Sequence, residues 1–186
     1  MRQALDAGVT FFQYRNKDGA RKGVYEIALM LARIAANARA RFIVNDHADI
    51  AAAVDADGVH LGQDDLPIEF ARKLLGGEKL IGISTHSFEQ AAAAEAAGAD
   101  YIGFGPIFPT TTKDAGQARG IHTLSIIKRS VALPVLAIGG IKHSNVQEVV
   151  RSGADGVAVL SAILSAGNIT TAVENMLSSI SDVGRE

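Results

Sequence analysis

The stretch Gly98-Ala-Asp-Tyr-Ile-Gly-Phe-Gly105 is the clearest indication of the fold class, because it places a turn of small residues directly before a short apolar run. Related phrases recur along the chain at Asp6-Ala-Gly8-Val, Asp55-Ala-Asp-Gly58-Val and Ser152-Gly-Ala-Asp-Gly156-Val. An internal repeat at this spacing is typical of a chain built from successive strand and helix units.

Short apolar runs alternate with alanine-rich helical stretches from one end of the chain to the other. Most of the runs are apolar on both strand faces, as is typical of parallel strands covered by helices. The predicted strands are 10–14, 41–44, 58–61, 80–84, 101–105, 134–138 and 156–160. The predicted helices include 24–39, 88–97, 122–129 and 145–151. Ser87 and Gln90 predict a capping box at the start of the second of these helices.

This alternation, with no linker between the units, predicts a single α/β domain over residues 1–186 with a parallel sheet. A doubly wound sheet is one solution. A TIM-type (β/α)8 barrel fits better, because polar residues and glycines cluster after nearly every strand and no GxGxxG motif follows any of them.

A barrel of this type needs eight strands, and only seven are predicted. The chain opens in a predicted helix over residues 1–7, so the first strand is the one that is missing. An open barrel exposes two strand edges. We therefore expect either that the natural protein is longer or that this chain is marginally stable, strand-swapped or inactive.

The composition excludes several classes of function. The chain has 18 basic and 20 acidic residues, a net charge of −2 and no block of like charges, which argues against nucleic-acid and membrane-surface partners. It has no cysteine, so disulfides, thiolate nucleophiles and cysteine-ligated zinc are excluded. No apolar run approaches the roughly 18 residues of a membrane span. We expect a cytoplasmic protein with small-molecule partners, and the sequence leaves open whether it forms a homo-oligomer.

Two aspartates, Asp46 and Asp65, follow neighbouring predicted strands. Oxygen ligands without histidine or cysteine suit Mg²⁺, which proteins usually hold with one or two carboxylates plus substrate phosphates. Helix N-capping is the alternative, because Asp46 precedes a predicted helix and Asp65 stands before Leu66-Pro67. As a pair at one rim of a barrel, they favour a metal site.

Cations and a glycine turn complete the predicted rim. Arg15, Lys17 and Lys113 follow strands on the same face as the aspartates, and such cations with Mg²⁺ are what a pyrophosphate requires. Solvated surface charges are the alternative. Gly139-Gly140 and Ser161 follow the last two strands, where barrels often bind a monophosphate. A purely structural turn is the alternative there. The five histidines show no ligand spacing, and no Ser-His-Asp arrangement is visible.

The chain resembles the thiamine-phosphate synthase family in stretches that span nearly its whole length, in the family's order. The similar stretches are QYRNK (13–17), VND (44–46), DGVHLGQDD (57–65), GISTH (82–86), GADYIGFGPIFPTTTK (98–113), IGGI (138–141) and GADGVAVLS (153–161). The resemblance implies a TIM-type barrel that joins hydroxymethylpyrimidine pyrophosphate to hydroxyethylthiazole phosphate, which gives thiamine phosphate and pyrophosphate. The family's opening strand is absent from this chain.

The resemblance also implies roles for individual residues. The pyrimidine pyrophosphate would be held by Gln13, Arg15, Lys17, Asn45, Ser84 and Lys113. Among these, Arg15, Ser84 and Lys113 would act in catalysis. Mg²⁺ would be bound by Asp46 and Asp65. The thiazole phosphate would be held by Thr110, Thr112, Gly140, Leu160 and Ser161.

Three competing interpretations stay open at this point. The first is a thiazole tautomerase of the same superfamily, which has no leaving group to neutralise and so no need for the aspartate pair or for Gln13-Tyr-Arg-Asn-Lys17. The second is another phosphate-sugar barrel, such as an isomerase or epimerase, which would need a proton-transfer pair that is not evident. The third is a truncated barrel that binds ligand without turnover.

Overall fold

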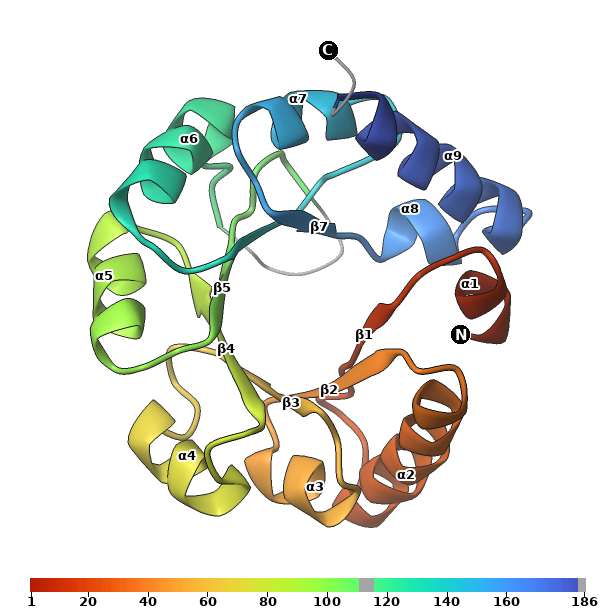
Figure 1. Ribbon diagram of the computed structural model, residues 1–186, viewed down its shortest axis with the longest axis vertical. Coiled ribbons are helices and arrows are strands. Elements are labelled where there is room, and N and C mark those ends of the chain that lie inside the picture. Colours follow the sequence, from red (N-terminus) through yellow and green to blue (C-terminus); the bar gives the residue numbers. More distant parts are fainter. Residues whose placement is uncertain (111–115, 184–186) are drawn as a thin grey trace.

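The computed structural model describes residues 1–110 and 116–183 as a curled sheet of seven parallel strands ringed by helices (Figure 1). The strands lie side by side in chain order. They are β1 (Phe11–Tyr14), β2 (Arg41–Asn45), β3 (Gly58–Leu61), β4 (Leu80–Thr85), β5 (Tyr101–Phe104), β6 (Val135–Ile138) and β7 (Gly156–Ala158). The predicted TIM-type α/β fold with one strand fewer is confirmed, and each predicted strand ends within two residues of an observed one.

The helices of the described residues cover the outer face of the sheet. They are α1 (Arg2–Asp6), α2 (Arg21–Asn37), α3 (Ala48–Ala53), α4 (Ile68–Leu75), α5 (Phe88–Ala96), α6 (Gly120–Ser130), α7 (Val146–Arg151), α8 (Ser161–Leu164) and α9 (Ile169–Val183). The four helices predicted by range correspond to α2, α5, α6 and α7. Within the described ranges, no helix has both the length and the apolar character that crossing a membrane requires.

The capping box of α5 is present in altered form. The Ser87 hydroxyl accepts a hydrogen bond from the Gln90 backbone N–H at 3.3 Å, as predicted. The Gln90 side chain, however, accepts from the backbone N–H of His86 at 2.7 Å rather than from that of Ser87. Both partners therefore still satisfy backbone donors at the helix start, where no intrahelical acceptor is available.

Most of the apolar core lies between the strands and the helices. Successive strand residues point to opposite faces of a sheet. On β2, Phe42 and Val44 belong to the main apolar cluster, as do Val59 and Leu61 on β3. The alternate positions point into the curl of the sheet, and several of these are polar. The fold therefore separates an apolar outer layer from a partly polar interior.

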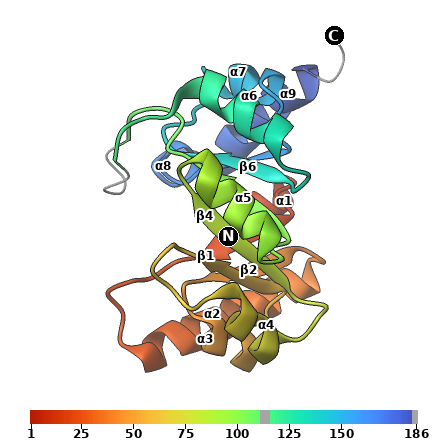
Figure 2. The same ribbon diagram turned by 90° about the vertical axis from the view of Figure 1, so that its left-hand side faces the viewer.

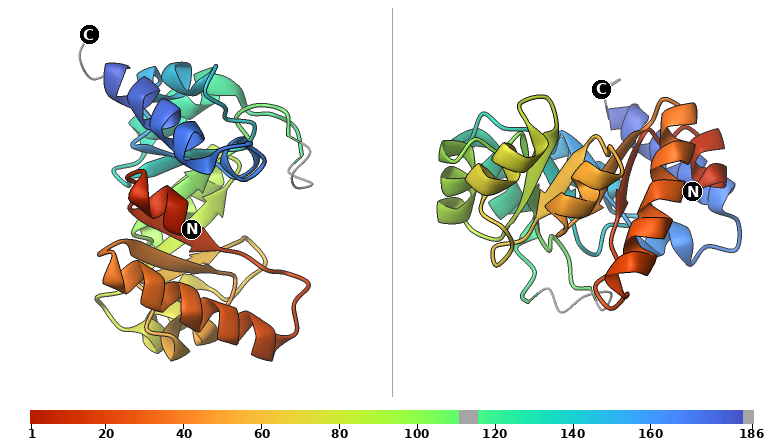
Figure 3. Two further views of the ribbon diagram at one scale, coloured as in Figure 1. Left: turned by 90° about the vertical axis from the view of Figure 1, so that its right-hand side faces the viewer. Right: turned by 90° about the horizontal axis from the view of Figure 1, so that it is seen from below.

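The sheet does not close among the described residues, because β1 pairs with β2 and β7 with β6 but not with each other. The helix layer nevertheless continues past this gap, where α1 lies beside α9 (Figure 3). A small apolar cluster of Ala4, Ile163 and Val173 joins α1, α8 and α9. Apolar contacts between helices, rather than strand pairing, thus span the open side of the sheet.

The repeated aspartate before every second strand has a structural role at the amino end of the sheet. Asp57 precedes β3, and its carboxylate accepts the N–H of Phe42 on β2 at 2.8 Å. Asp100 does the same for Ile81 on β4 at 2.7 Å, and Asp155 for Val135 on β6 at 2.7 Å. Each aspartate therefore fastens the start of one strand to the start of the strand before it.

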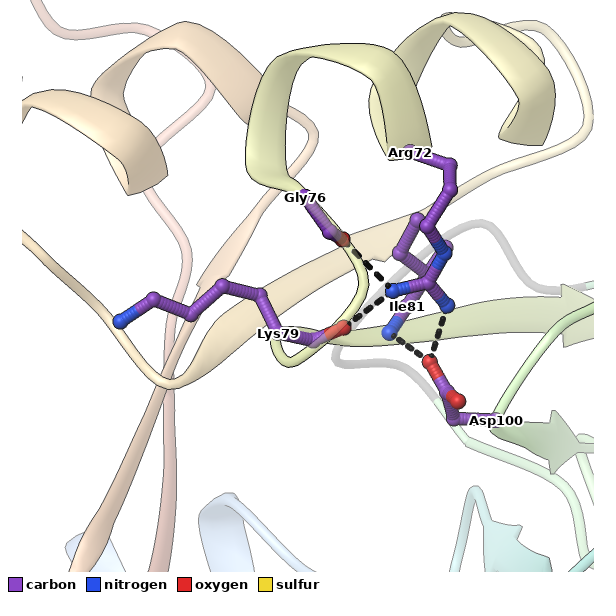
Figure 4. A network of polar contacts seen from close by, with 5 residues as sticks. All are labelled: Arg72, Gly76, Lys79, Ile81 and Asp100. Atoms are coloured by element: carbon purple, nitrogen blue, oxygen red, sulfur yellow. Dashed lines mark hydrogen bonds and ion pairs between the residues drawn. The ribbon is translucent and has the colours of Figure 1, made fainter.

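Each of these carboxylates also has a cationic partner. The Arg72 guanidinium lies 2.6 Å from the Asp100 carboxylate and donates to the carbonyl oxygen of Lys79 at 2.5 Å (Figure 4). Lys128 lies 2.7 Å from Asp155. Burial acts to raise the pKa of Asp155, but the hydrogen bonds from Lys128 and from the Val135 N–H outweigh it and hold the pKa below its usual range. We call Asp57, Asp100 and Asp155, with the N–H groups that they accept, the clamps at the amino ends of the strands.

Candidate active site at the carboxyl ends of the strands

The predicted site residues lie at one end of the sheet because all seven strands are parallel. In such barrels the carboxyl ends of the strands carry the active site. Figure 2 shows the loop that follows β1 and the chain that follows β5 projecting from the same side of the molecule. Residues far apart in the sequence thus share one rim.

Asp46 follows β2 directly in an unusual backbone conformation. Its φ of +65° lies in the left-handed region, which non-glycine residues seldom adopt. The Asp46 N–H donates to the carbonyl oxygen of His60 on β3 at 2.8 Å, and the Asn45 side-chain amide donates to the Asp46 carboxylate. Backbone of this kind persists where its surroundings hold it in place, as these two hydrogen bonds do for Asp46.

Asp65 approaches Asp46 from the loop after β3, close enough to accept a hydrogen bond from the Asp46 carboxyl when that group is protonated. The Asp65 carboxylate also accepts the Gly62 N–H at 2.6 Å, which fixes the turn. Burial, the hydrogen bond to Asp65 and the charge of Asp65 together raise the pKa of Asp46, although Lys17 and Arg15 act to lower it. Two carboxylates this close repel each other when both are ionised, and a divalent cation between them would relieve that repulsion.

The N-capping alternative for the two aspartates is wrong. The residue at the N-cap of α3 is His47, and no side chain caps that helix. The residue at the N-cap of α4 is Pro67, again without a side-chain cap. The Asp46 carboxyl instead lies beside that of Asp65, to which it donates a hydrogen bond when protonated, and the Asp65 carboxylate accepts the N–H of Gly62 in its own loop.

The cations from the loop after β1 lie beside this pair. The Lys17 ammonium is 4.0 Å from the Asp46 carboxylate and remains half exposed. Arg15 is exposed and close enough for its charge to act on Asp46. Of the other predicted residues, Thr112 and Lys113 lie outside the described residues. The structure thus brings two of the three predicted cations to the aspartate pair.

The glycine turn after β6 packs against the protein itself. Gly139 and Gly140 have φ of +95° and +66°, so both need the conformational freedom of glycine. A Cβ on Gly140 would stand 2.7 Å from the Cβ of Phe108, and one on Gly139 would stand 2.5 Å from the Cβ of Pro106. Because they lack a Cβ, these glycines allow the chain that follows β5 to pack closely against the turn. That chain carries the half-buried Thr110.

The remaining predicted residues lie after β7 and on the inner strands. Leu160 is 55% exposed and stands at the N-cap of α8, and Ser161 is its first residue. Asn45 ends β2 and is buried, Ser84 is half-buried on β4, and Gln13 is exposed on β1. All of these residues lie at or near the carboxyl ends of their strands, where the sequence predicts them.

Sequence reasoning missed two buried polar residues inside the curl of the sheet. His60 is 7% exposed and Tyr101 is 5% exposed. The His60 ring connects Tyr101 and Ser84, at 3.1 Å from the phenol oxygen and 2.9 Å from the serine hydroxyl. The available signal was a histidine inside an otherwise apolar strand, at a position that faces the interior.

The donor set fits Mg²⁺ better than a metal held by protein ligands alone. No group of three or more His, Cys, Asp or Glu side chains that could hold a metal ion is found within residues 1–110 and 116–183. Two carboxylates beside two cations match the usual binding of Mg²⁺, in which substrate phosphates and waters supply the other ligands.

Comparisons with known proteins identify the family of the chain. The family model described as thiamine monophosphate synthase matches residues 1–163. A thiamine-phosphate synthase of Shouchella clausii is 46% identical over 187 residues, which cover all of this chain and 89% of the relative. One from Methanosarcina barkeri is 48% identical over 170 residues, which cover 91% of this chain and 77% of the relative.

A solved structure is also closely similar. Thiamine phosphate pyrophosphorylase from Pyrococcus furiosus superposes with a TM-score of 0.91 at 42% identity, over 98% of this chain and 88% of that one. A family match over most of the chain, relatives above 40% identity and the same fold point to one conclusion. This chain belongs to the thiamine monophosphate synthase family.

Proposed function

We propose that this chain is a thiamine-phosphate synthase, which joins hydroxymethylpyrimidine pyrophosphate to hydroxyethylthiazole phosphate and releases pyrophosphate. Family membership supports the reaction. The observation that carries the assignment of the site is the contact between Asp46 and Asp65 beside Lys17 and Arg15. Such a set of charges suits a pyrophosphate that binds with a divalent cation.

The charged residues of this rim are proposed to bind and stabilise the leaving group, pyrophosphate. Asp46 and Asp65 would hold Mg²⁺, which when bound neutralises charge on the departing pyrophosphate. Arg15 and Lys17 add positive charge from the loop after β1, and Lys113 is proposed to add another. Asn45 positions the Asp46 carboxylate, to which its amide donates a hydrogen bond.

The chemistry at carbon needs no protein nucleophile or base. The bond between the pyrimidine methylene carbon and the pyrophosphate oxygen breaks first, and the electron-rich aminopyrimidine stabilises the resulting cation. The thiazole nitrogen then donates its lone pair to that carbon, and the new C–N bond completes thiamine phosphate. The protein contributes charge stabilisation on the leaving group and positioning of the two reactants. Gln13 and Ser84 are proposed to position the pyrimidine substrate.

The thiazole phosphate is proposed to bind on the other side of the rim, at the chain after β5 and the turns after β6 and β7. Thr110, Thr112 and Ser161 offer hydroxyl groups, and Gly140 and Leu160 offer backbone N–H groups. The site would thus seat its two anions apart, with the reacting atoms between them. We also propose that the enzyme acts in the cytoplasm on these small substrates.

A thiazole tautomerase, the nearest alternative, is not favoured. The named relatives are thiamine-phosphate synthases, and a tautomerase has no pyrophosphate that would need Asp46, Asp65, Lys17 and Arg15 together.

The test is pyrophosphate release measured with both substrates, with each substrate alone, and with and without Mg²⁺. Release that requires both substrates and the metal is the expected result. Metal-independent isomerisation of a thiazole phosphate would replace the proposal with the tautomerase. Ligand binding without turnover would identify the chain as a barrel that has lost its activity.

A further inference from the structure

A chain of hydrogen bonds crosses the interior of the sheet from β1 to β4 by way of β5 and β3. The Gln13 side chain bonds to the Tyr101 hydroxyl. The Tyr101 hydroxyl lies 3.1 Å from His60 Nδ1, and His60 Nε2 lies 2.9 Å from Ser84 Oγ. Its two ends, Gln13 and Ser84, are residues that the proposed function assigns to the pyrimidine substrate, whereas the two middle members have no assigned role.

The sheet is built to accommodate this chain. His60 and Tyr101 both lie opposite Gly82 in the strand register. A Cβ on Gly82 would stand 2.0 Å from the Tyr101 ring, and one on Gly103 would stand 3.1 Å from the His60 ring. Two strand glycines thus leave room for the two rings. A strand glycine of this kind marks a close approach rather than a good strand former.

The protonation of the phenol limits which way the hydrogen bonds can run. Burial raises the pKa of Tyr101 well above its usual value, with the nearby Asp100 charge adding to the rise and the Gln13 hydrogen bond opposing it. Tyr101 therefore keeps its proton. If the Gln13 amide donates to the phenol oxygen, the phenol O–H is free to donate to His60 Nδ1. A neutral imidazole that accepts at one nitrogen donates at the other.

We propose that His60 is a positioning residue whose Nε2–H donates to Ser84 Oγ, so that the Ser84 hydroxyl proton points to the bound pyrimidine pyrophosphate. Ser84 then presents a donor rather than lone pairs to the substrate. The opposite tautomer would draw the Ser84 proton back to His60 and turn an acceptor toward an anion. This inference rests on the proposed function, since it needs an anionic substrate at Ser84.

The tautomer is tested without any assay of activity. The ¹⁵N chemical shifts of His60 in the folded, ligand-free protein report which ring nitrogen carries the proton. We expect a protonated Nε2 and an unprotonated Nδ1, and Tyr101→Phe should shift the Nδ1 signal. A proton on Nδ1 alone, or on both nitrogens, would overturn the inference whatever the enzyme catalyses.

Two amide variants separate hydrogen bonding from ring packing in the enzyme assay. His60→Gln can place an N–H donor near the position of Nε2, whereas His60→Asn is too short to reach Ser84. We expect kcat for pyrophosphate release to stay within about fivefold of the wild type in His60→Gln and to fall roughly ten- to a hundredfold in His60→Asn. Equal losses in both would contradict a role that depends on the donor.

A double-mutant cycle asks whether His60 acts through Ser84. His60→Phe should lower kcat strongly in the wild type but by less than about threefold when Ser84→Ala is already present. Multiplicative losses would mean that the two residues act independently, and His60 would then be no more than a packing residue.

Tyr25→Phe, on the outer face of the molecule, serves as the control for Tyr101→Phe in the ¹⁵N experiment. A wild type without pyrophosphate release refutes the proposed function, and the ¹⁵N result then still decides the tautomer.

Discussion

The barrel carries aspartates at both ends of its strands, and the two groups differ in what surrounds them. At the amino ends, Asp100 and Asp155 each accept a backbone N–H and pair closely with Arg72 and Lys128. At the carboxyl ends, Asp46 faces Asp65, and its cationic neighbour Lys17 is 4.0 Å away. The first group is electrostatically satisfied within the protein, whereas the second is left with like charges together.

The pKa directions express the same contrast. The pKa of Asp155 is lowered, because Lys128 and a backbone N–H outweigh its burial. The pKa of Asp46 is raised, because burial and Asp65 outweigh Lys17 and Arg15. A carboxyl group whose ionised form is stabilised by its neighbours contributes to folding stability. One whose ionised form is destabilised gains from a bound cation. The predictions below test this division between the two ends.

The largest expected effect is on turnover when Asp46 is removed. Asp46→Ala should lower kcat by about a hundredfold or more, because one preorganised charged contact at the leaving group is lost, worth about 3 kcal/mol. Steady-state pyrophosphate release at saturating Mg²⁺ measures the effect. Asp182→Ala, at an exposed position on α9, is the control and should leave kcat unchanged. Wild-type turnover in Asp46→Ala would remove the residue from the mechanism.

A loss of comparable size is expected at Lys113, whose role follows from the family resemblance. Lys113→Ala should lower kcat by roughly a hundredfold, because the leaving pyrophosphate loses a positive charge. Lys113→Arg, which keeps the charge, should recover part of that loss. If both variants turn over at the wild-type rate in the same assay, the lysine does not contact the leaving group.

The clamps at the amino ends should affect stability but not catalysis. Asp100→Ala removes the partner of Arg72 and of the Ile81 N–H, and should lower the free energy of unfolding by about 2 kcal/mol. At this chain length the melting temperature should fall by about 4–8 °C. Calorimetry measures the shift, and kcat per folded molecule should not change. A large loss of kcat with unchanged melting would assign this end of the barrel to the active site.

The smallest expected effect is an increase in stability when the charge of Asp46 is removed. A carboxyl whose pKa is raised on folding favours its protonated form, so its contribution to stability is lost as the pH rises through the folded-state pKa. At neutral pH the ionised Asp46 therefore destabilises the metal-free protein. Asp46→Asn should therefore raise the melting temperature at pH 7, by less than Asp100→Ala lowers it, with no gain below pH 4.

Thermal melts in a chelator at both pH values would decide this point. Asp155→Asn is the matched comparison from the other end of the barrel, and should lower the melting temperature at pH 7 because its carboxylate is stabilised. A drop in melting temperature for both variants would show that the two ends do not differ.

Much of the architecture could be predicted from sequence because it depends on local patterns. Strands 41–44 and 58–61 are apolar on both faces, which indicates parallel strands beneath helices, and the structure confirms them as β2 and β3. The gap beside β1 was also predictable, since counting strands is enough to find it. The contact of α1 with α9 across that gap was not, because it depends on how two distant helices pack.

The site was predictable as a set of strand ends but not as a set of contacts. Asp46 and Asp65 were singled out by their positions after neighbouring strands, yet capping and metal binding could not be separated without their side-chain directions. The repeated aspartates were recognised as a motif, but their carboxylates bond to the preceding strand, which no local pattern reveals.

Local sequence patterns are enough to predict the alternation of strands and helices, the parallel sheet and the end of the sheet where the chemistry-bearing residues gather. These follow from periodicity and turn residues, which act over a few positions of the chain. Three features became visible only in the folded chain: which carboxylates have cationic and N–H partners, which residues pack against the glycine turn after β6, and the position of His60 between Tyr101 and Ser84. Charge balance and hydrogen-bond partners depend on distances between strands that the chain brings together only when the sheet curls.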